Sequence, residues 1–491
     1  MLSRRELFFL LALFIASLPA VTARLYSSDE VEYFSYLRSL WFDHDVSFEN
    51  EYQYFYDHRI AQTPDFHQTF LELETATGRR INYGTIGCAI LWTPFYAVAD
   101  VTTRVLRSMG RPIEADGYSQ PYVSAVAYGS AFYGFAAIVM AVAAARQVIR
   151  RYEFSSGLAV WLGTPLLFYM YVAPPFSHAC SAFALALFVS VWLKVRQTWS
   201  PRGIVVLALT AALMAMVREQ DLVCVLGPAV DFGLTEFKGK GKRESASGPS
   251  EARSRRARAS GCGAPRAVSN AKPLIVVLVG GVAFLIGYLP QLIAYQALNG
   301  FPRPSPLVTR KMFWHSPHAL QVLLDPEHGF FFWTPLALLA LAGLILLIAV
   351  PRSVIGDEAE RGEVRQIAAC MLLMVATQIY ISGAVESWTV AGAFGQRRFV
   401  AVTIFLVIGL AAFRCWAGSR LARIATNVLI GLCVWWNLAL TLEFGTSMMD
   451  RQKLELRRNA YDAFVTLPRT APKLFYRYFT NRSSFYKTAT D

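Results

Sequence analysis

Long apolar blocks separated by short basic segments limit what this chain can fold into. Residues 273–293 and 330–350 are two such blocks, and neither contains a charged side chain. A soluble core needs amphipathic elements, whereas a bilayer span needs roughly 20 consecutive apolar residues. The composition agrees, because 55% of the 491 residues are hydrophobic and only 16% are charged. We therefore expect an all-α, polytopic membrane protein.

The apolar blocks can be placed as about 11 transmembrane helices. Lys and Arg accumulate on the cytoplasmic side of membrane proteins, and basic residues follow the second, fourth, sixth, eighth and tenth blocks. This pattern predicts a cytoplasmic N-terminus and an outer C-terminus. The predicted spans are 7–23, 122–145, a block ending near 172, 179–194, 203–217, 222–232, 273–293, 330–350, 367–381, a block ending at 414, and 425–442.

Segment 85–106 is almost long enough to be a further span. Pro94, Asp100 and Arg104 interrupt it, and counting it as a span would place the later basic flanks outside, against the orientation rule. We therefore expect an interfacial or re-entrant helix here.

The spans and their connections define one membrane-embedded domain, 1–444, and an outer tail, 445–491. The domain has a first outer loop at 24–83, a basic cytoplasmic loop at 237–272 and a second outer loop at 294–329. The basic loop holds ten Lys and Arg residues against two Glu, so it supplies +8 of the net charge of +13. Its composition predicts disorder, and its place beside spans favours a topology determinant or a site for anionic lipid or a partner. Nucleic acid is not an expected partner.

The first outer loop is acidic within a basic protein, and Asp29 and Glu30 stand directly after the first span. Carboxylates against a membrane are costly unless they are paired, metal-bound or used in chemistry. Partial desolvation would raise the pKa of such a group and make it a better general base. Adjacent helical residues point about 100° apart, so we expect only one of the two to face a reacting centre. The other acids of the loop are expected to form a solvated surface.

Four landmarks, in order, resemble bacterial GT-C glycosyltransferases, a group that includes protein O-mannosyltransferases and lipid A aminoarabinose transferases. The first is the acidic pair Asp29 and Glu30, and the second is YGTIG at 83–87 with TPFY at 93–96. The third is HGFFFWTP at 328–335, and the fourth is Trp388 with GAFGQRRF at 392–399. The resemblance covers residues 25–400 and departs from the family at 84–85, where a Pro is commoner.

The resemblance implies transfer of a sugar from a polyprenyl-phosphate donor to an acceptor at the outer face of the bacterial inner membrane. Asp29 would take a proton from the acceptor hydroxyl, and Glu30 would position Asp29 or be the base in its place. The leaving phosphate needs positive charge as the bond breaks. The candidates for this charge are Arg218, Arg310, Lys311, Arg397 and Arg398. We favour the last two, because the nearby Gly392 and Gly395 would let a phosphate approach the backbone.

Asp43, His44 and Asp45 form a candidate divalent-cation site, since some GT-C enzymes use such an ion; no other cofactor is expected. His178, after two prolines, is expected to pack against a kink.

Two other functions compete with glycosyl transfer. A secondary transporter would carry ionisable groups at mid-membrane, whereas these spans are nearly free of Asp and Glu. A non-catalytic protein that binds a lipid carrier would have the same fold. The expected partners are a polyprenyl-phosphate-linked sugar, membrane lipids, and an acceptor that is a lipid, a glycan or a protein.

Overall fold

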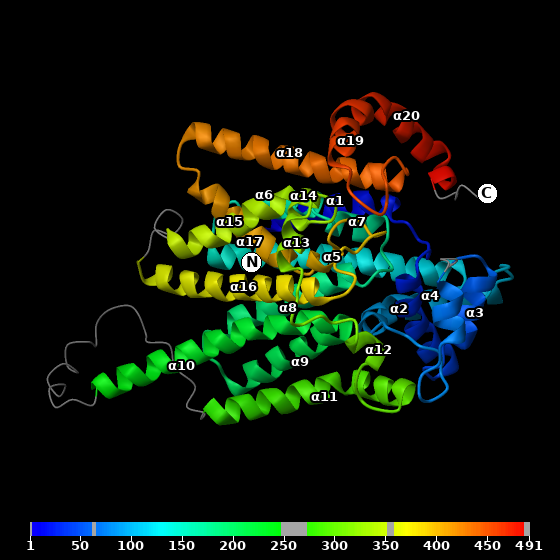
Figure 1. The fold of residues 1–491 in the computed structure, drawn as a ribbon, viewed down its shortest axis with the longest axis horizontal. Helices are drawn as coiled ribbons and strands as arrows, with labels where there is room; N and C mark the ends of the chain where they lie inside the picture. Colours follow the sequence, from blue (N-terminus) through cyan, green and yellow to red (C-terminus); the bar gives the residue numbers. More distant parts are fainter. Residues whose placement is uncertain (1, 61–64, 247–272, 351–357, 486–491) are drawn as a thin grey trace.

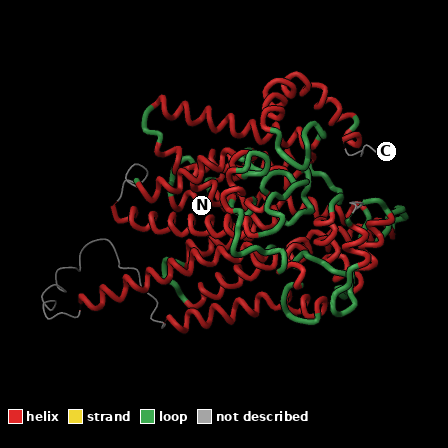
Figure 2. The backbone as a smooth tube through the Cα atoms, viewed as in Figure 1, coloured by secondary structure: helices red, strands yellow, loops and turns green. Residues whose placement is uncertain are grey.

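The computed structural model describes residues 2–60, 65–246, 273–350 and 358–485, and these consist of helices and connecting loops (Figure 2). No strand forms within these ranges. The prediction of an all-α fold is confirmed for the described part of the chain.

The helices follow one another closely along the sequence. In chain order they are α1 (Arg4–Ser17), α2 (Ser28–Arg38), α3 (Glu49–Asp57), α4 (Gly87–Ser108), α5 (Gln120–Val148), α6 (Glu153–Leu162), α7 (Leu166–Tyr171), α8 (His178–Val195), α9 (Pro201–Val217), α10 (Leu226–Ala246), α11 (Pro273–Asn299), α12 (Pro306–Thr309), α13 (Ala319–Leu324), α14 (Phe330–Trp333), α15 (Pro335–Ala349), α16 (Glu358–Ala384), α17 (Thr403–Trp416), α18 (Arg420–Gly445), α19 (Leu456–Tyr461) and α20 (Leu467–Thr480).

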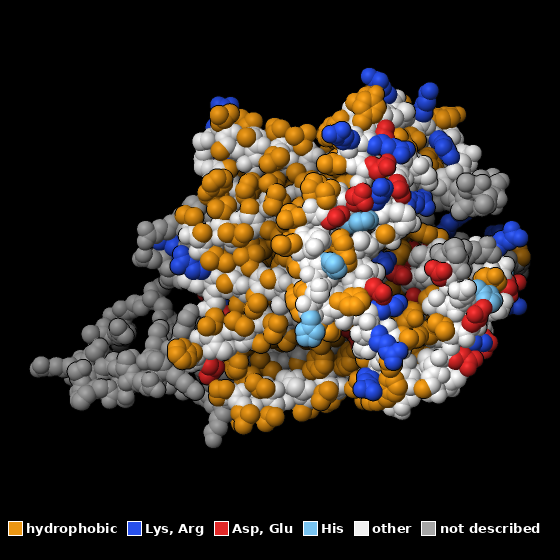
Figure 3. Space-filling view, viewed as in Figure 1, with side chains coloured by type: hydrophobic (Ala, Val, Ile, Leu, Met, Phe, Trp, Pro, Cys, Tyr) orange, Lys and Arg blue, Asp and Glu red, His pale blue; other side chains and the backbone are white. Residues whose placement is uncertain are grey.

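Five of the described helices are long and apolar enough to cross a membrane: α5, α8, α11, α16 from Arg361, and α18. Helices α9, α15 and α17 are apolar but shorter. The long helices run side by side, and α2, α3 and α4 lie together at one end, which we call the α2 end (Figure 1). Hydrophobic side chains cover the flank of the bundle, whereas charged side chains gather towards the α2 end (Figure 3). This distribution is the one expected of a protein surrounded by lipid.

Each predicted span overlaps one helix or two successive helical segments, although only five of the described helices are long and apolar enough to cross a membrane. The third block is divided into α6 and α7, and the eighth into α14 and α15. In both cases the break lies at a Thr-Pro step, Thr164–Pro165 and Thr334–Pro335. Proline has no N–H and disfavours helical geometry in the residue before it, so these breaks follow directly from the sequence.

Segment 85–106 forms the single helix α4, despite Pro94 within it. Its Asp100 is buried and accepts hydrogen bonds from the Tyr122 hydroxyl at 2.6 Å and the Trp41 indole at 3.3 Å. Arg104, one turn later, pairs with the same carboxylate at 3.0 Å. The polar residues that interrupt this segment therefore fasten α4 to α5 and to the first outer loop.

Ion pairs join helix ends that the sequence predicts to lie on the same side of the membrane. At the predicted cytoplasmic ends, Glu6 pairs with Arg146 at 2.7 Å and Arg196 pairs with Glu363 at 2.5 Å. Arg196 is also paired with the fully buried Asp231 at 2.8 Å, which ties α8 to α10. Contacts at the predicted outer ends are Lys453 to Glu327, and the Arg482 guanidinium to the Pro19 carbonyl.

Two glycines allow α15 and α17 to touch backbone to backbone. A Cβ added to Gly343 would lie 1.8 Å from the carbonyl oxygen of Gly409, and one added to Gly409 would lie 2.1 Å from the carbonyl oxygen of Ala340. Any larger residue at either position must push the two helices apart.

The predicted loop at 237–272 is helical at its start, because α10 continues to Ala246. Residues 247–272 lie outside the described part of the chain. The predicted tail, 445–491, contains α19 and α20, which lie near the C-terminal end of α18 (Figure 1).

Candidate active site

Glu30 is the third residue of α2 and completes the cap at its start. The Ser27 side chain caps the helix, and one Glu30 carboxylate oxygen accepts from the backbone N–H groups of Tyr26 at 2.8 Å and Ser27 at 3.1 Å. This reciprocal arrangement is a capping box, which satisfies otherwise unpaired donors. Glu30 is fully buried, its second oxygen has no hydrogen-bond partner among the described residues, and burial raises its pKa to about 8. Its contacts make Glu30 part of the cap of α2.

Asp29, in the first turn of the same helix, points elsewhere. Its carboxylate pairs with the Arg397 guanidinium at 2.6 Å, and 38% of its side chain is exposed. A helix N-terminus also stabilises an anion. Asp29 is therefore a reachable carboxylate held by one arginine.

The turn that carries Arg397 depends on two glycines and one glutamine. Gly392 and Gly395 have φ values of +82° and +61°, which side chains rarely adopt. The Gln396 amide is buried and donates to the carbonyls of His328 at 2.8 Å and Trp388 at 3.1 Å. These features fix the backbone just before Arg397 and link the third sequence landmark to the fourth.

Arg398 is buried behind Arg397. Its guanidinium donates to the Ser387 carbonyl at 2.8 Å and to the Ser387 hydroxyl at 3.0 Å, so its direct partners are neutral. Burial, together with the charges of Arg397 and Arg218, lowers the pKa of Arg398 to about 9. Three guanidinium groups thus lie within electrostatic reach of one another.

Arg218 reaches this cluster from the end of α9. The Thr85 hydroxyl donates to the Val217 carbonyl at 3.0 Å, which closes the helix, and Arg218 itself has an extended backbone. One guanidinium nitrogen lies 3.1 Å from the Ser177 hydroxyl and 3.0 Å from Nδ1 of His178. Like Arg398, Arg218 has neutral partners in these two contacts.

The arrangement leaves positive charge in excess. Arg218, Arg397 and Arg398 bring three cations. Asp29 pairs with Arg397, and the buried Asp221 acts electrostatically on Arg218, which leaves one cation in excess. Buried charges without a counter-charge are costly, and guanidinium groups match phosphate oxygens in geometry and charge. The site is therefore suited to an anionic ligand such as a phosphate ester.

Aromatic residues form the wall around these charges. The Phe176 ring lies 5.5 Å from the Arg397 guanidinium carbon. The Tyr169 hydroxyl donates to the Phe394 carbonyl at 3.0 Å, and its ring lies 4.5 Å from that of His178. His178, expected to pack against a kink, thus contacts Arg218 within the site, while its buried Nε2 has no hydrogen-bond partner in the described part of the chain.

Sequence reasoning missed Glu32 and Tyr33 as neighbours of Asp29 on one face of α2. Glu32 is buried, accepts from the Tyr83 backbone N–H at 2.7 Å, and has its pKa raised to about 8 by burial and by the charge of Asp29. Residues three and four apart share one helix face, so Asp29, Glu32 and Tyr33 line the same side of α2. The spacing from Asp29 was the signal that could have found them.

The two basic candidates of the second outer loop lie apart from the arginine cluster. The Lys311 ammonium lies 4.8 Å from the centre of the Tyr83 ring and acts electrostatically on Glu32. Arg310 is exposed, and its described hydrogen bond is that of its backbone N–H to Pro306. Lys311 therefore borders the site, whereas Arg310 has no described contact with it.

The candidate cation ligands have other partners. The Asp43 carboxylate pairs with Arg38 and accepts from the Asn50 amide at 2.8 Å. One Asp45 oxygen accepts from the Ser39 hydroxyl at 2.8 Å, and His44 has a left-handed backbone with φ of 58°. Across the described residues, no three His, Cys, Asp or Glu side chains are grouped to hold a metal ion.

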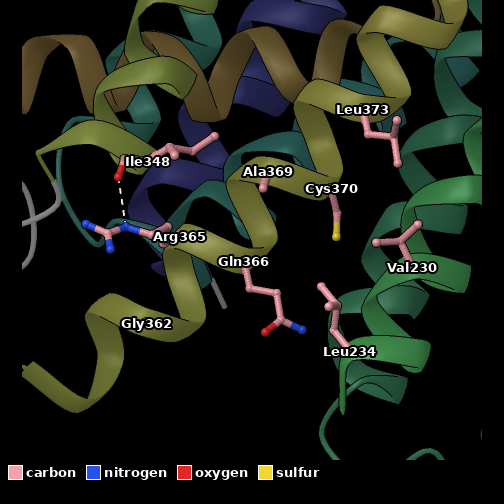
Figure 4. A pocket seen from close by; sticks show the side chains of 9 residues that line it. All are labelled: Val230, Leu234, Ile348, Gly362, Arg365, Gln366, Ala369, Cys370 and Leu373. Carbon is pink, nitrogen blue, oxygen red and sulfur yellow. Dashed lines mark hydrogen bonds between the residues drawn. The ribbon is translucent and has the colours of Figure 1, made fainter. Parts of the chain in front are cut away.

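A hollow of about 380 Å³ lies at the opposite end of the bundle, between α10, α15 and α16. Figure 4 shows mainly apolar side chains around it, with the Arg365 guanidinium donating to the Ile348 carbonyl at 2.8 Å. It contains none of the predicted site residues.

The structure brings Asp29, Arg218, Arg397 and Arg398 together from segments almost 370 residues apart in the sequence, with Lys311 at the edge. Arg310 and the Asp43 to Asp45 group lie outside this site. Comparisons with known proteins find no matching family model, no similar curated protein and no similar solved structure.

Proposed function

We propose that the protein is a membrane glycosyltransferase of the GT-C type, which moves a sugar from a polyprenyl-phosphate donor to an acceptor hydroxyl. The observation that carries the proposal is the pairing of a reachable carboxylate, Asp29, with a cluster of arginines in excess of it. A general base and a phosphate-binding group are the two elements that this reaction requires.

In the proposed reaction, Asp29 takes the proton of the acceptor hydroxyl. The acceptor oxygen forms a bond to the anomeric carbon, and the bond from that carbon to the phosphate oxygen breaks. The polyprenyl phosphate leaves with the electron pair. Arg397, Arg398 and Arg218 stabilise the charge that develops on it.

The ion pair between Asp29 and Arg397 gives the donor a second role. A phosphate that binds Arg397 competes with Asp29 for the same guanidinium. Binding of the donor would thereby release the carboxylate to accept a proton. The base would become available only when the donor is in place.

The topology we propose has 11 crossings, a cytoplasmic N-terminus and α4 at the membrane interface. It is supported by the ion pairs between helix ends, since Glu6 with Arg146 and Arg196 with Glu363 each join ends predicted to be cytoplasmic. In this topology Asp29 lies outside, beside the lipid that carries the donor. We place the protein in the bacterial inner membrane on the sequence resemblance.

The proposal is tested by the lipid-linked sugars of cells that lack the protein. We expect mass spectrometry of extracted lipids to find one accumulated polyprenyl-phosphate sugar, which the wild-type protein removes on re-expression. Asp29→Asn should fail to remove it, whereas the matched variants Glu30→Gln and Asp43→Asn should succeed. Removal by Asp29→Asn at wild-type protein levels would refute Asp29 as the base. A transporter or a non-catalytic carrier-binding protein should also tolerate that change.

A further inference from the structure

Helix α20 has two distinct faces. With a turn of 3.6 residues, Arg469, Lys473 and Arg477 fall on one side of the helix. The other side carries only apolar residues: Leu467, Pro468, Ala471, Pro472, Leu474, Phe475, Tyr478 and Phe479. This is the pattern of a helix that lies on a boundary between water and an apolar phase.

Only part of the apolar side is used for packing within the chain. Leu467 is buried, whereas Phe475 is 60% exposed and Phe479 is 82% exposed. Large exposed aromatic side chains next to one another are unusual unless something covers them. This part of α20 therefore has an apolar surface that the rest of the described chain leaves open.

Both ends of α20 are fixed to the helix bundle. Just before it, the Ala463 carbonyl accepts from the Trp435 indole of α18 at 3.1 Å. Just after it, the Arg482 guanidinium donates to the carbonyls of Pro19 at 2.6 Å and Ala20 at 2.8 Å, at the end of α1. The helix is thus held beside the bundle rather than hanging from it.

The position of α20 points to lipid as the missing cover. Trp435 lies ten residues before the end of α18, or about 15 Å along a helix, so the chain returns alongside a candidate span before α20 begins. The neighbouring flank of α18 carries exposed apolar side chains, among them Val428 and Leu432. The exposed aromatic side chains of α20 and the exposed apolar flank of α18 are both surfaces of the kind that the bilayer covers.

We propose that α20 is an interfacial helix that inserts Phe475 and Phe479 among the lipids of the outer leaflet. Arg469 and Lys473, on the opposite face, contact anionic headgroups. Such a helix combines apolar burial with electrostatic attraction. This inference depends on the membrane location but not on glycosyl transfer.

The test is photo-crosslinking of the full-length protein in vesicles of phosphatidylethanolamine and phosphatidylglycerol. Phe479→benzoylphenylalanine should give several-fold more lipid adduct than Lys473→benzoylphenylalanine on the basic face. Both positions are exposed, so neither change disturbs the core. Replacing phosphatidylglycerol by phosphatidylcholine should reduce the adduct at 479.

Three results would overturn the proposal. Equal lipid adducts at 479 and 473 would mean that the helix has no lipid-facing side. A crosslinked dimer at 479 would identify a second copy of the chain as the cover, and reaction with solvent alone would show that nothing covers it. Because the readout is a lipid adduct, failure here would leave the proposed enzymatic activity unaffected.

Discussion

The capping contacts of Glu30 predict how substitutions at this position change the stability of the protein. Glu30→Ala removes the acceptor for the backbone N–H groups of Tyr26 and Ser27. Each unsatisfied donor costs about 1–3 kcal/mol, or about 2–6 kcal/mol for both. Glu30→Gln keeps an acceptor oxygen of the same reach. We therefore expect Glu30→Ala to lower the Tm strongly and Glu30→Gln to lower it little.

The same pair of variants tests the raised pKa. Burial raises the pKa of Glu30 to about 8 from an ordinary value of 4.5, so between these pH values the folded protein holds a proton that the unfolded chain releases. Stability must then fall as the pH rises from 4.5 to 8, by on the order of 4 kcal/mol at 1.36 kcal/mol per pH unit. Glu30→Gln has no such proton, and its Tm relative to wild type should rise over this range.

The assay is thermal unfolding of detergent-solubilised protein, followed by circular dichroism at pH 5, 6.5 and 8. Asp43→Asn is a suitable control, because it removes an acid of the same loop outside the capping box. If the Tm of Glu30→Gln and the Tm of the wild type change in parallel with pH, Glu30 does not titrate as its burial implies. If Glu30→Gln is as unstable as Glu30→Ala, the capping box is not what holds α2.

Three further predictions concern packing and the site. Gly409→Ala should sharply reduce the yield of folded protein, because its Cβ would lie 2.1 Å from the Ala340 carbonyl oxygen. The control Gly431→Ala in α18 should be tolerated, because its Cβ would meet no atom within 4 Å. Equal yields of the two variants would contradict the close approach of α15 and α17. Arg196→Ala should lower the free energy of unfolding by about 3–5 kcal/mol, because it leaves the Asp231 carboxylate buried without its counter-charge. Adding Asp231→Asn to Arg196→Ala should recover part of the lost Tm, and the absence of recovery would argue against a charge effect. Arg397→Ala should raise the KM for the polyprenyl-phosphate donor at least about tenfold, equivalent to one charge-assisted hydrogen bond, and an unchanged KM would remove Arg397 from the phosphate site.

The helices were largely predictable from the sequence, because apolar blocks of span length can be satisfied in few other ways. The Thr-Pro steps at 164–165 and 334–335 even carry the signal for the two broken spans. The helical character of 237–246 was missed, since a composition of Lys, Gly and Ser gives little local preference. The polar residues of α4 suggested that the helix would be interrupted. The sequence could not show that Asp100 is satisfied within one continuous helix, because its partners Tyr122 and Trp41 come from α5 and the first outer loop.

The candidate site was predictable in part. Asp29 and Arg397 stood out because of their place beside apolar blocks and small residues. The structure distinguishes Asp29 from Glu30 because Glu30 closes the capping box of α2. The sequence already contained a signal for this, since a Ser followed three residues later by a Glu is a recognisable capping pattern. No local pattern indicates that Arg218 meets His178, because that contact requires α8 and α9 to be packed.

The contact between Arg482 and the carbonyls that follow α1 joins segments more than 460 residues apart in the sequence. The backbone that leads into the helix of Asp29 is therefore held by a residue that follows α20. Arg482→Ala would leave every candidate site residue in the chain and still remove the contact that holds the segment before them.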